Sequence, residues 1–155
     1  MAKNANLLTI FAEDVRQEVN GQISIIGVFD DELVISKYPT TIPKICLLST
    51  ISTLIDDPMD IASFRVFFEN GETLISSELP PELSTNRKAI ISQTKDIGDY
   101  EWMFMRVQVE MSNLRVDQDS TLRAEIVGSD GSVATSNSLK IILREPQKRT
   151  PSITL

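Results

Sequence analysis

The stretch DVRQEVNGQISIIGVF, residues 14–29, decides the fold class of this chain. Asn20 and Gly21 stand at its centre, and this dipeptide supplies the positive φ angles that tight β-hairpin turns require. The residues after the turn are apolar on both alternating faces of a strand. One face carries Ile23, Ile25 and Phe29, and the other carries Ile26 and Val28. The stretch therefore predicts a β-hairpin.

The same period of two recurs in the rest of the chain. Apolar and polar residues alternate in three further segments, at 101–111, 121–127 and 138–144. Two more hairpin signals stand between strand-like runs, at Asn70-Gly71 and Asp130-Gly131. Nearly continuous apolar runs occupy 42–53 and 87–94, and their short length and β-branched residues favour strands over a core helix.

These patterns predict an all-β chain that folds as an antiparallel β-sandwich of about eight strands. With 155 residues, the chain has the size of one domain. We place that domain at 1–145 and expect a polar C-terminal tail at 146–155. Edge strands expose unpaired backbone groups, so we also expect that a homo-oligomer could form through sheet edges or through the tail.

Composition excludes several classes of function. The net charge of −7 argues against binding to nucleic acid and to anionic membrane lipids, which both attract basic proteins. The chain has no histidine and one cysteine, so Ser–His and Cys–His nucleophile pairs, zinc sites of cysteine and histidine, and internal disulfides cannot form. Cys46 lies among apolar neighbours, which predicts a buried packing residue. No apolar run approaches the roughly 20 residues of a membrane span, and we expect a cytoplasmic protein.

One polar pair falls within the opening stretch. Asp14 continues the strand face that carries Leu8, Ile10 and Ala12, where an unpaired carboxylate would be costly to bury. Arg16 lies two residues further on the same face and could pair with Asp14. Two interpretations stay open: a polar pair in a pocket, or two side chains that point to solvent at the end of a strand.

A longer stretch, EDVRQEVNGQISIIGVFDDELV at 13–34, resembles the opening of a family of bacterial and phage proteins of uncharacterised function. The shared pattern is Asp-Val-Arg, then Glu, then Asn-Gly, then a Ser-Ile-Ile-Gly-Val-Phe strand. The resemblance is looser over the rest of the chain. It implies an immunoglobulin-like sandwich and a microbial or viral source, and it implies no catalytic residues.

Aromatic side chains suggest a contact surface. If Met103, Met105 and Met111 face the core, then the alternating residues of the same strand point outward. Those outward residues are Tyr100, Trp102, Phe104 and Arg106. An exposed aromatic row beside an arginine is typical of a protein-interface hot spot, whereas core packing is the alternative interpretation.

Acidic residues gather in three expected loops. These groups are Asp30, Asp31 and Glu32; Asp56, Asp57 and Asp60; and Asp117 and Asp119. Loop carboxylates of some β-sandwiches bind calcium, which takes six to eight oxygen ligands. Solvated turns are the alternative, because aspartate favours turn conformations. We name Asp30, Asp31, Asp56 and Asp57 as weak calcium candidates and expect no other metal site.

Taken together, the sequence predicts a non-enzymatic protein-interaction module of bacterial or phage origin that needs no cofactor. Its partner would be another protein or a second copy of the chain, so that a component of a virion or its assembly and a binder of a host protein both fit. The localisation would then be cytoplasmic, or the virion. The alternative is a β-sandwich that senses or sequesters calcium or a small ligand through its acidic loops. An enzyme that uses carboxylates alone is the least favoured class.

Overall fold

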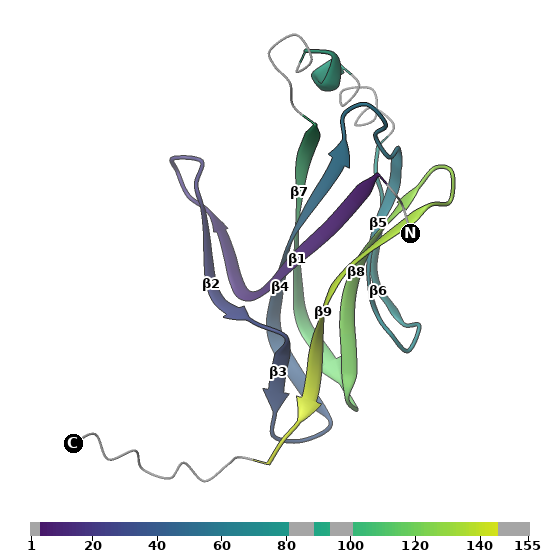
Figure 1. The fold of residues 1–155 in the computed structure, drawn as a ribbon. Coiled ribbons are helices and arrows are strands. Elements are labelled where there is room, and N and C mark those ends of the chain that lie inside the picture. The colour runs from purple at the N-terminus through teal and green to yellow at the C-terminus, as the bar shows by residue number, and fades with distance from the viewer. Residues whose placement is uncertain (1–3, 81–88, 94–100, 146–155) are drawn as a thin grey trace, which may run out of the picture.

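Two β-sheets packed face to face make up the computed structural model, which describes residues 4–80, 89–93 and 101–145 (Figure 1). The first sheet has the strand order β2 (Ile23–Phe29), β1 (Ala5–Gln17), β4 (Thr40–Leu54), β7 (Trp102–Val116). The second has the order β3 (Glu32–Ile35), β9 (Val133–Leu143), β8 (Ser120–Gly128), β5 (Ile61–Phe68), β6 (Thr73–Glu78). The predicted all-β sandwich is therefore confirmed.

All three hairpin turns lie where the sequence places them. Gly21, Gly71 and Gly131 have φ angles of 80°, 98° and 82°, the left-handed conformation that glycine adopts without a steric penalty. They join β1 to β2, β5 to β6 and β8 to β9. In each turn the preceding Asn or Asp side chain also accepts a hydrogen bond from the backbone N–H two residues on.

The described residues form nine strands, close to the expected eight. Two details of the predicted fold are corrected. The β3–β9 pair is parallel in an otherwise antiparallel arrangement. The expected strand at 87–94 is wrong for the part that is described, because 89–93 is helical. Its apolar run has no alternation, and such a short run does not distinguish a strand from a helical turn.

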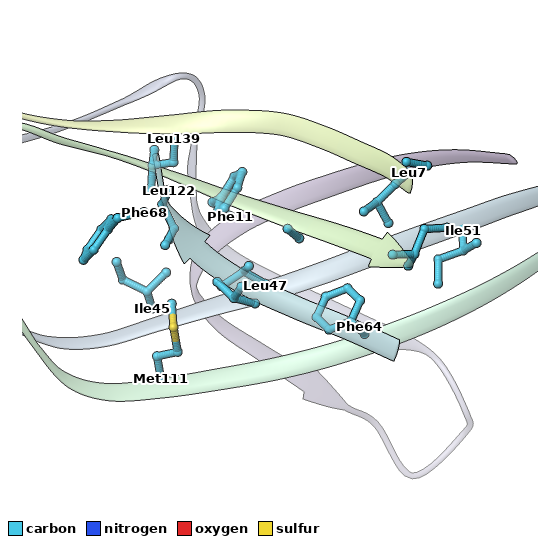
Figure 2. Close-up of a cluster of buried hydrophobic side chains, with 14 of the residues drawn as sticks. Leu7, Phe11, Ile45, Leu47, Ile51, Phe64, Phe68, Met111, Leu122 and Leu139 are labelled. Atoms are coloured by element: carbon cyan, nitrogen blue, oxygen red, sulfur yellow. The ribbon is translucent and has the colours of Figure 1, made fainter. Parts of the chain in front are cut away.

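The main core fills the space between the two sheets. Figure 2 shows Phe11, Leu47 and Phe64 meeting there with side chains from both sheets, and all three are fully buried. On β1 the face toward the main core carries Leu7 and Phe11, whereas Leu8, Ile10 and Ala12 lie on the outer face. The run from Leu7 to Ala12 is apolar on both faces, and alternation alone cannot choose between them.

A second, smaller cluster forms because the β1–β2 hairpin folds over the outer face of the first sheet. Val15, Ile23 and Ile25 of the hairpin pack against the outer face of that sheet. The residues they cover include Ala12, Cys46 and Leu48. The side-chain amide of Gln108 on β7 donates to the Val15 carbonyl at 3.0 Å, which holds the hairpin across the sheet. Cys46 is buried there, as predicted.

Because the hairpin bends over the sheet, apolar residues of β2 that strict alternation assigns to one face belong to two different clusters. Ile23 and Ile25 belong to the small cluster, whereas Phe29 packs against the main core. Gly27, with a φ of 65°, lies between them and interrupts the regular strand. The expected common face of Ile23, Ile25 and Phe29 is therefore wrong.

Candidate functional site

Strands β1, β4 and β7 place six side chains together on the outer face of the first sheet. Residues opposite one another on neighbouring strands form a row across the sheet. One row holds Leu8, Thr50 and Arg106, and the next row on the same face holds Ser52 and Phe104. Trp102 lies in the row after that. We call this set the Phe104 face: Leu8, Thr50, Ser52, Trp102, Phe104 and Arg106.

Two large apolar side chains of this face lie in water. Phe104 is 68% exposed and Leu8 is 61% exposed, although both belong to paired strands. Their neighbours explain the orientation: Met105 and Val107 on β7 pack against the main core, so Phe104 must point the other way. Thr50 and Ser52 on the middle strand have short side chains, so nothing on β4 covers the two flanking apolar groups.

Of the other predicted contact residues, the structure describes Arg106 and Trp102. Arg106 is exposed beside Phe104, and no described residue forms an ion pair with it. Trp102 is half-buried at the start of β7, and Tyr100 lies outside the described residues. Met111 is buried in the main core, as the alternation on this strand predicts. Sequence reasoning missed Leu8 as a surface residue, because its strand is apolar on both faces.

The Phe104 face ends where the hairpin begins to cover the sheet. Leu48 and Cys46 lie one and two rows beyond Thr50 on the same outer face, and both are buried under the hairpin. One half of the outer face is therefore covered by this chain's own residues, and the other half presents Leu8 and Phe104 to solvent.

The predicted polar pair is brought together, and a third residue joins it. Asp14 accepts hydrogen bonds from Arg16 and from Lys44, whose Nζ lies 2.5 Å from Asp14 Oδ1. Lys44 Nζ also lies 3.3 Å from Glu110. The Lys44 ammonium first, and then the Arg16 guanidinium, lower the pKa of the Asp14 carboxyl below its ordinary value. Lys44 lies 30 positions from Asp14, and only the register of β1 against β4 brings the two together.

A cleft opens beside this polar group, between β4 and the edge of the second sheet. We call it the side cleft, and its volume is about 430 Å³. Its lining is mostly apolar: Phe29 of β2, Leu33 and Ile35 of β3, and residues 40–43 of β4, with Glu13 and Lys44 also contributing.

The structure does not bring the acidic loop residues together as calcium ligands. Within the residues that it describes, no three carboxylate, thiol or imidazole side chains lie close enough to hold a metal ion. Two of the acids instead accept hydrogen bonds from residues distant in the sequence. Asp57 accepts from Asn4, and Asp119 accepts from Tyr38 and from the backbone N–H of Leu143 at 3.0 Å.

Comparison with known proteins found no matching family model, no matching curated protein and no matching solved structure. The resemblance of 13–34 to a bacterial and phage family therefore stays a prediction. No helix in the described part of the chain has the length and apolar character needed to cross a membrane.

Proposed function

We propose that this chain is a non-enzymatic protein-binding module and that the Phe104 face is the centre of its binding surface. One observation carries the proposal: Phe104 and Leu8 are held in water by paired strands at 68% and 61% exposure. A rigid sheet that presents an aromatic ring beside an arginine has the composition of an interface hot spot.

The free energy of burying apolar side chains favours an occupant for this face. Full burial of a phenylalanine or leucine side chain is worth ~1.5–3 kcal/mol each. The sheet already fixes the backbone on which Phe104, Leu8 and Arg106 stand, so little ordering entropy opposes their burial. A partner that covers the face would gain this energy without rearranging the sandwich.

The size of the face indicates how the partner would lie. Strands are spaced ~4.8 Å apart and alternate residues on one face are ~7 Å apart, so the face measures ~10 Å by ~14 Å. A specific interface buries ~800 Å² on each partner. The partner must therefore extend beyond the face, either over the hairpin or along the outer edge of β7, which pairs with no described strand.

The strand order supports the finer proposal that the sandwich is immunoglobulin-like. Immunoglobulin domains hold strands A, B, E and D in one sheet and C, F and G in the other, with C′ added in the variable type. In the first sheet, the neighbouring strands β1, β4 and β7 correspond to strands A, B and E. In the second sheet, β5, β6, β8 and β9 correspond to strands C, C′, F and G. The second sheet then has the order G-F-C-C′. Immunoglobulin sandwiches serve as rigid scaffolds that position binding residues.

The test is a quantitative pull-down from the cells that express the protein. The variant Leu8→Ser/Phe104→Ser removes both exposed apolar groups, and Val34→Ser is the matched control. Val34 is 48% exposed on β3 of the other sheet. All three side chains are exposed, so each variant should unfold within ~0.5 kcal/mol of the parent protein.

We expect the parent and the Val34→Ser variant to retain one stoichiometric partner and the double variant to lose it by about tenfold or more. Equal recovery of the partner by all three proteins would refute a binding role for this face.

A further inference from the structure

The side cleft lies along a strand edge that has no partner. β1 pairs with β4 only from Ala5 opposite Thr53 to Ala12 opposite Cys46, and then turns away into the hairpin. Over 40–45, β4 pairs with β7 on one side, and no described strand pairs with its other side. Pro43, which has no N–H to donate, lies in this part of the strand, as is typical of a strand edge.

Apolar side chains stand directly beside this free edge. Leu33 and Ile35 of β3 and Phe29 of β2 line the cleft, and each also packs against the main core. An unpaired strand edge combined with apolar pockets is the combination that binds an added strand: main-chain hydrogen bonds give affinity, and alternate side chains enter the pockets. A volume of about 430 Å³ is enough for a few such side chains.

The charge at the rim favours a basic segment. Glu13 lines the cleft, its side chain is exposed, and it forms no ion pair with a described residue. The one cation of the lining, Lys44, is already bonded to Asp14 and Glu110. The protein as a whole carries a net charge of −7.

We propose that the side cleft binds the C-terminal segment 146–155 of a second copy of this chain as an added strand on β4. The segment reads PQKRTPSITL: two basic residues, Lys148 and Arg149, precede an alternating end with Ile153 and Leu155 as its apolar members. The basic pair suits the Glu13 rim, and the two apolar side chains suit the lining of Leu33 and Ile35.

The position at which β9 ends favours the tail of a second copy over the chain's own tail as the occupant of the cleft. Leu143 at the end of β9 pairs with Ile35, and the Arg144 N–H donates to the Ile35 carbonyl at 3.1 Å. β3 and β9 run parallel and end together, and β4 begins at that same end of the sandwich after the 36–39 connection (Figure 1). The chain's own tail would therefore have to reverse its direction at this end to run along 40–45, whereas the tail of a second copy is under no such constraint.

The experiment has two parts. Sedimentation velocity over a range of concentrations compares the full chain with a chain that ends at residue 145. Fluorescence anisotropy then measures binding of the labelled peptide PQKRTPSITL to the truncated chain. We expect the full chain to associate with increasing concentration, the truncated chain to stay monomeric, and the peptide to bind the truncated chain more weakly as salt is raised.

Substitutions then locate the binding site. Leu33→Gln should weaken peptide binding about tenfold, whereas Val34→Gln, on the opposite face of the same strand, should leave it unchanged. Glu13→Gln alters only an exposed rim residue and should weaken binding several-fold even if Leu33→Gln proves unstable.

Three results would overturn the proposal. The first is failure of the peptide to bind the truncated chain, or binding that does not respond to Glu13→Gln and Leu33→Gln. The second is association of the truncated chain as strong as that of the full chain, which would move self-association to another surface. The third is a full chain that stays monomeric while the truncated chain binds the peptide, which would make the chain's own tail the occupant. The peptide-binding measurements do not depend on the Phe104 face, so they separate this proposal from the proposed function.

Discussion

At the residue scale, the hydroxyls of Thr9 and Ser49 form a polar pair inside the apolar sandwich. Their oxygens lie 2.8 Å apart, and the two residues are 2% and 0% exposed. One hydroxyl donates to the other, and burial leaves little water to replace this bond. Removing only one of them leaves a buried hydroxyl without a partner, which costs more than removing both.

A double-mutant cycle tests this pairing. We expect Ser49→Ala to lower the free energy of unfolding by ~1–3 kcal/mol, and Thr9→Val/Ser49→Ala to recover part of that loss. Urea unfolding followed by circular dichroism measures both. Strictly additive single-variant effects would contradict the pairing.

The phenol of Tyr38 gives a prediction about pH. Partial desolvation, together with its hydrogen bond to the Asp119 carboxylate, raises the pKa of Tyr38 to about 12 from an ordinary value of 10.0. The unfolded chain loses this proton at the lower pH. The contribution of Tyr38 to stability is therefore complete below pH 10 and is lost as the pH rises through about 12.

The chain has two tyrosines, so Tyr100→Phe leaves Tyr38 as the only phenol. We expect the ultraviolet absorbance of its tyrosinate to appear with a midpoint near 12 in the folded protein. Asp119→Asn should shift that midpoint downward. A midpoint near 10 in the parent background would show that the Tyr38–Asp119 contact does not form.

At the element scale, the β1–β2 hairpin depends on Gly27. Its φ is 65°, and a Cβ at this position would lie 2.6 Å from the Glu13 side chain. Gly21 at the turn has a φ of 80° but no atom within 4 Å of such a Cβ. The two glycines therefore share a conformational requirement and differ in the space around them.

Alanine at these two positions separates the effects. Gly21→Ala should cost only the left-handed conformation, ~1–2 kcal/mol. Gly27→Ala should cost more, because Glu13 must also move. Thermal unfolding of the two variants measures the difference, and equal losses would mean that Glu13 adapts freely.

The sequence predicted the β-hairpins best, because a single dipeptide identifies each turn. Asn20-Gly21, Asn70-Gly71 and Asp130-Gly131 each identify a hairpin for two reasons. The glycine readily takes the positive φ angle that the turn needs at its position, and the Asn or Asp side chain accepts a hydrogen bond within the turn. The helix at 89–93 could not be predicted in the same way, since its apolar run carries no period.

At the scale of the whole molecule, Asn137 connects the two sheets. Its side-chain oxygen accepts from the Thr9 N–H at 2.8 Å, and its Nδ2 donates to the Thr9 carbonyl at 2.9 Å. Residues 5–10 of β1 lie before the segment that pairs with β2, so this edge faces β9 without a strand partner. The amide of Asn137 supplies the two hydrogen bonds that a neighbouring strand would otherwise make.

Losing this bridge should weaken the packing of the sheets. We expect Asn137→Ala to lower the free energy of unfolding by ~1–2 kcal/mol, about the net worth of two hydrogen bonds. Asn137→Asp keeps the acceptor and loses the donor, so its effect should exceed that of the exposed control Thr135→Ala. Hydrogen exchange at Thr9 provides the local readout, and unchanged protection in Asn137→Ala would contradict the bridge.

The candidate site could be predicted only in part, because it depends on pairing between distant strands. Phe104 and Arg106 follow from alternation on β7 alone. Leu8 and Lys44 do not, since their surroundings are set by the register of β1, β4 and β7 and by the hairpin that covers half of that face. The side cleft likewise exists only because β1 leaves β4 after Ala12.

Photo-crosslinking in the cell shows whether the Phe104 face binds another protein. Benzoylphenylalanine would replace Phe104 in one variant and Val34 in a control, and both would be irradiated in the cells that express the protein. We predict one dominant covalent adduct with another protein from position 104 and none from position 34. Adducts of equal yield and identity at the two positions, or none at position 104, would contradict the claim.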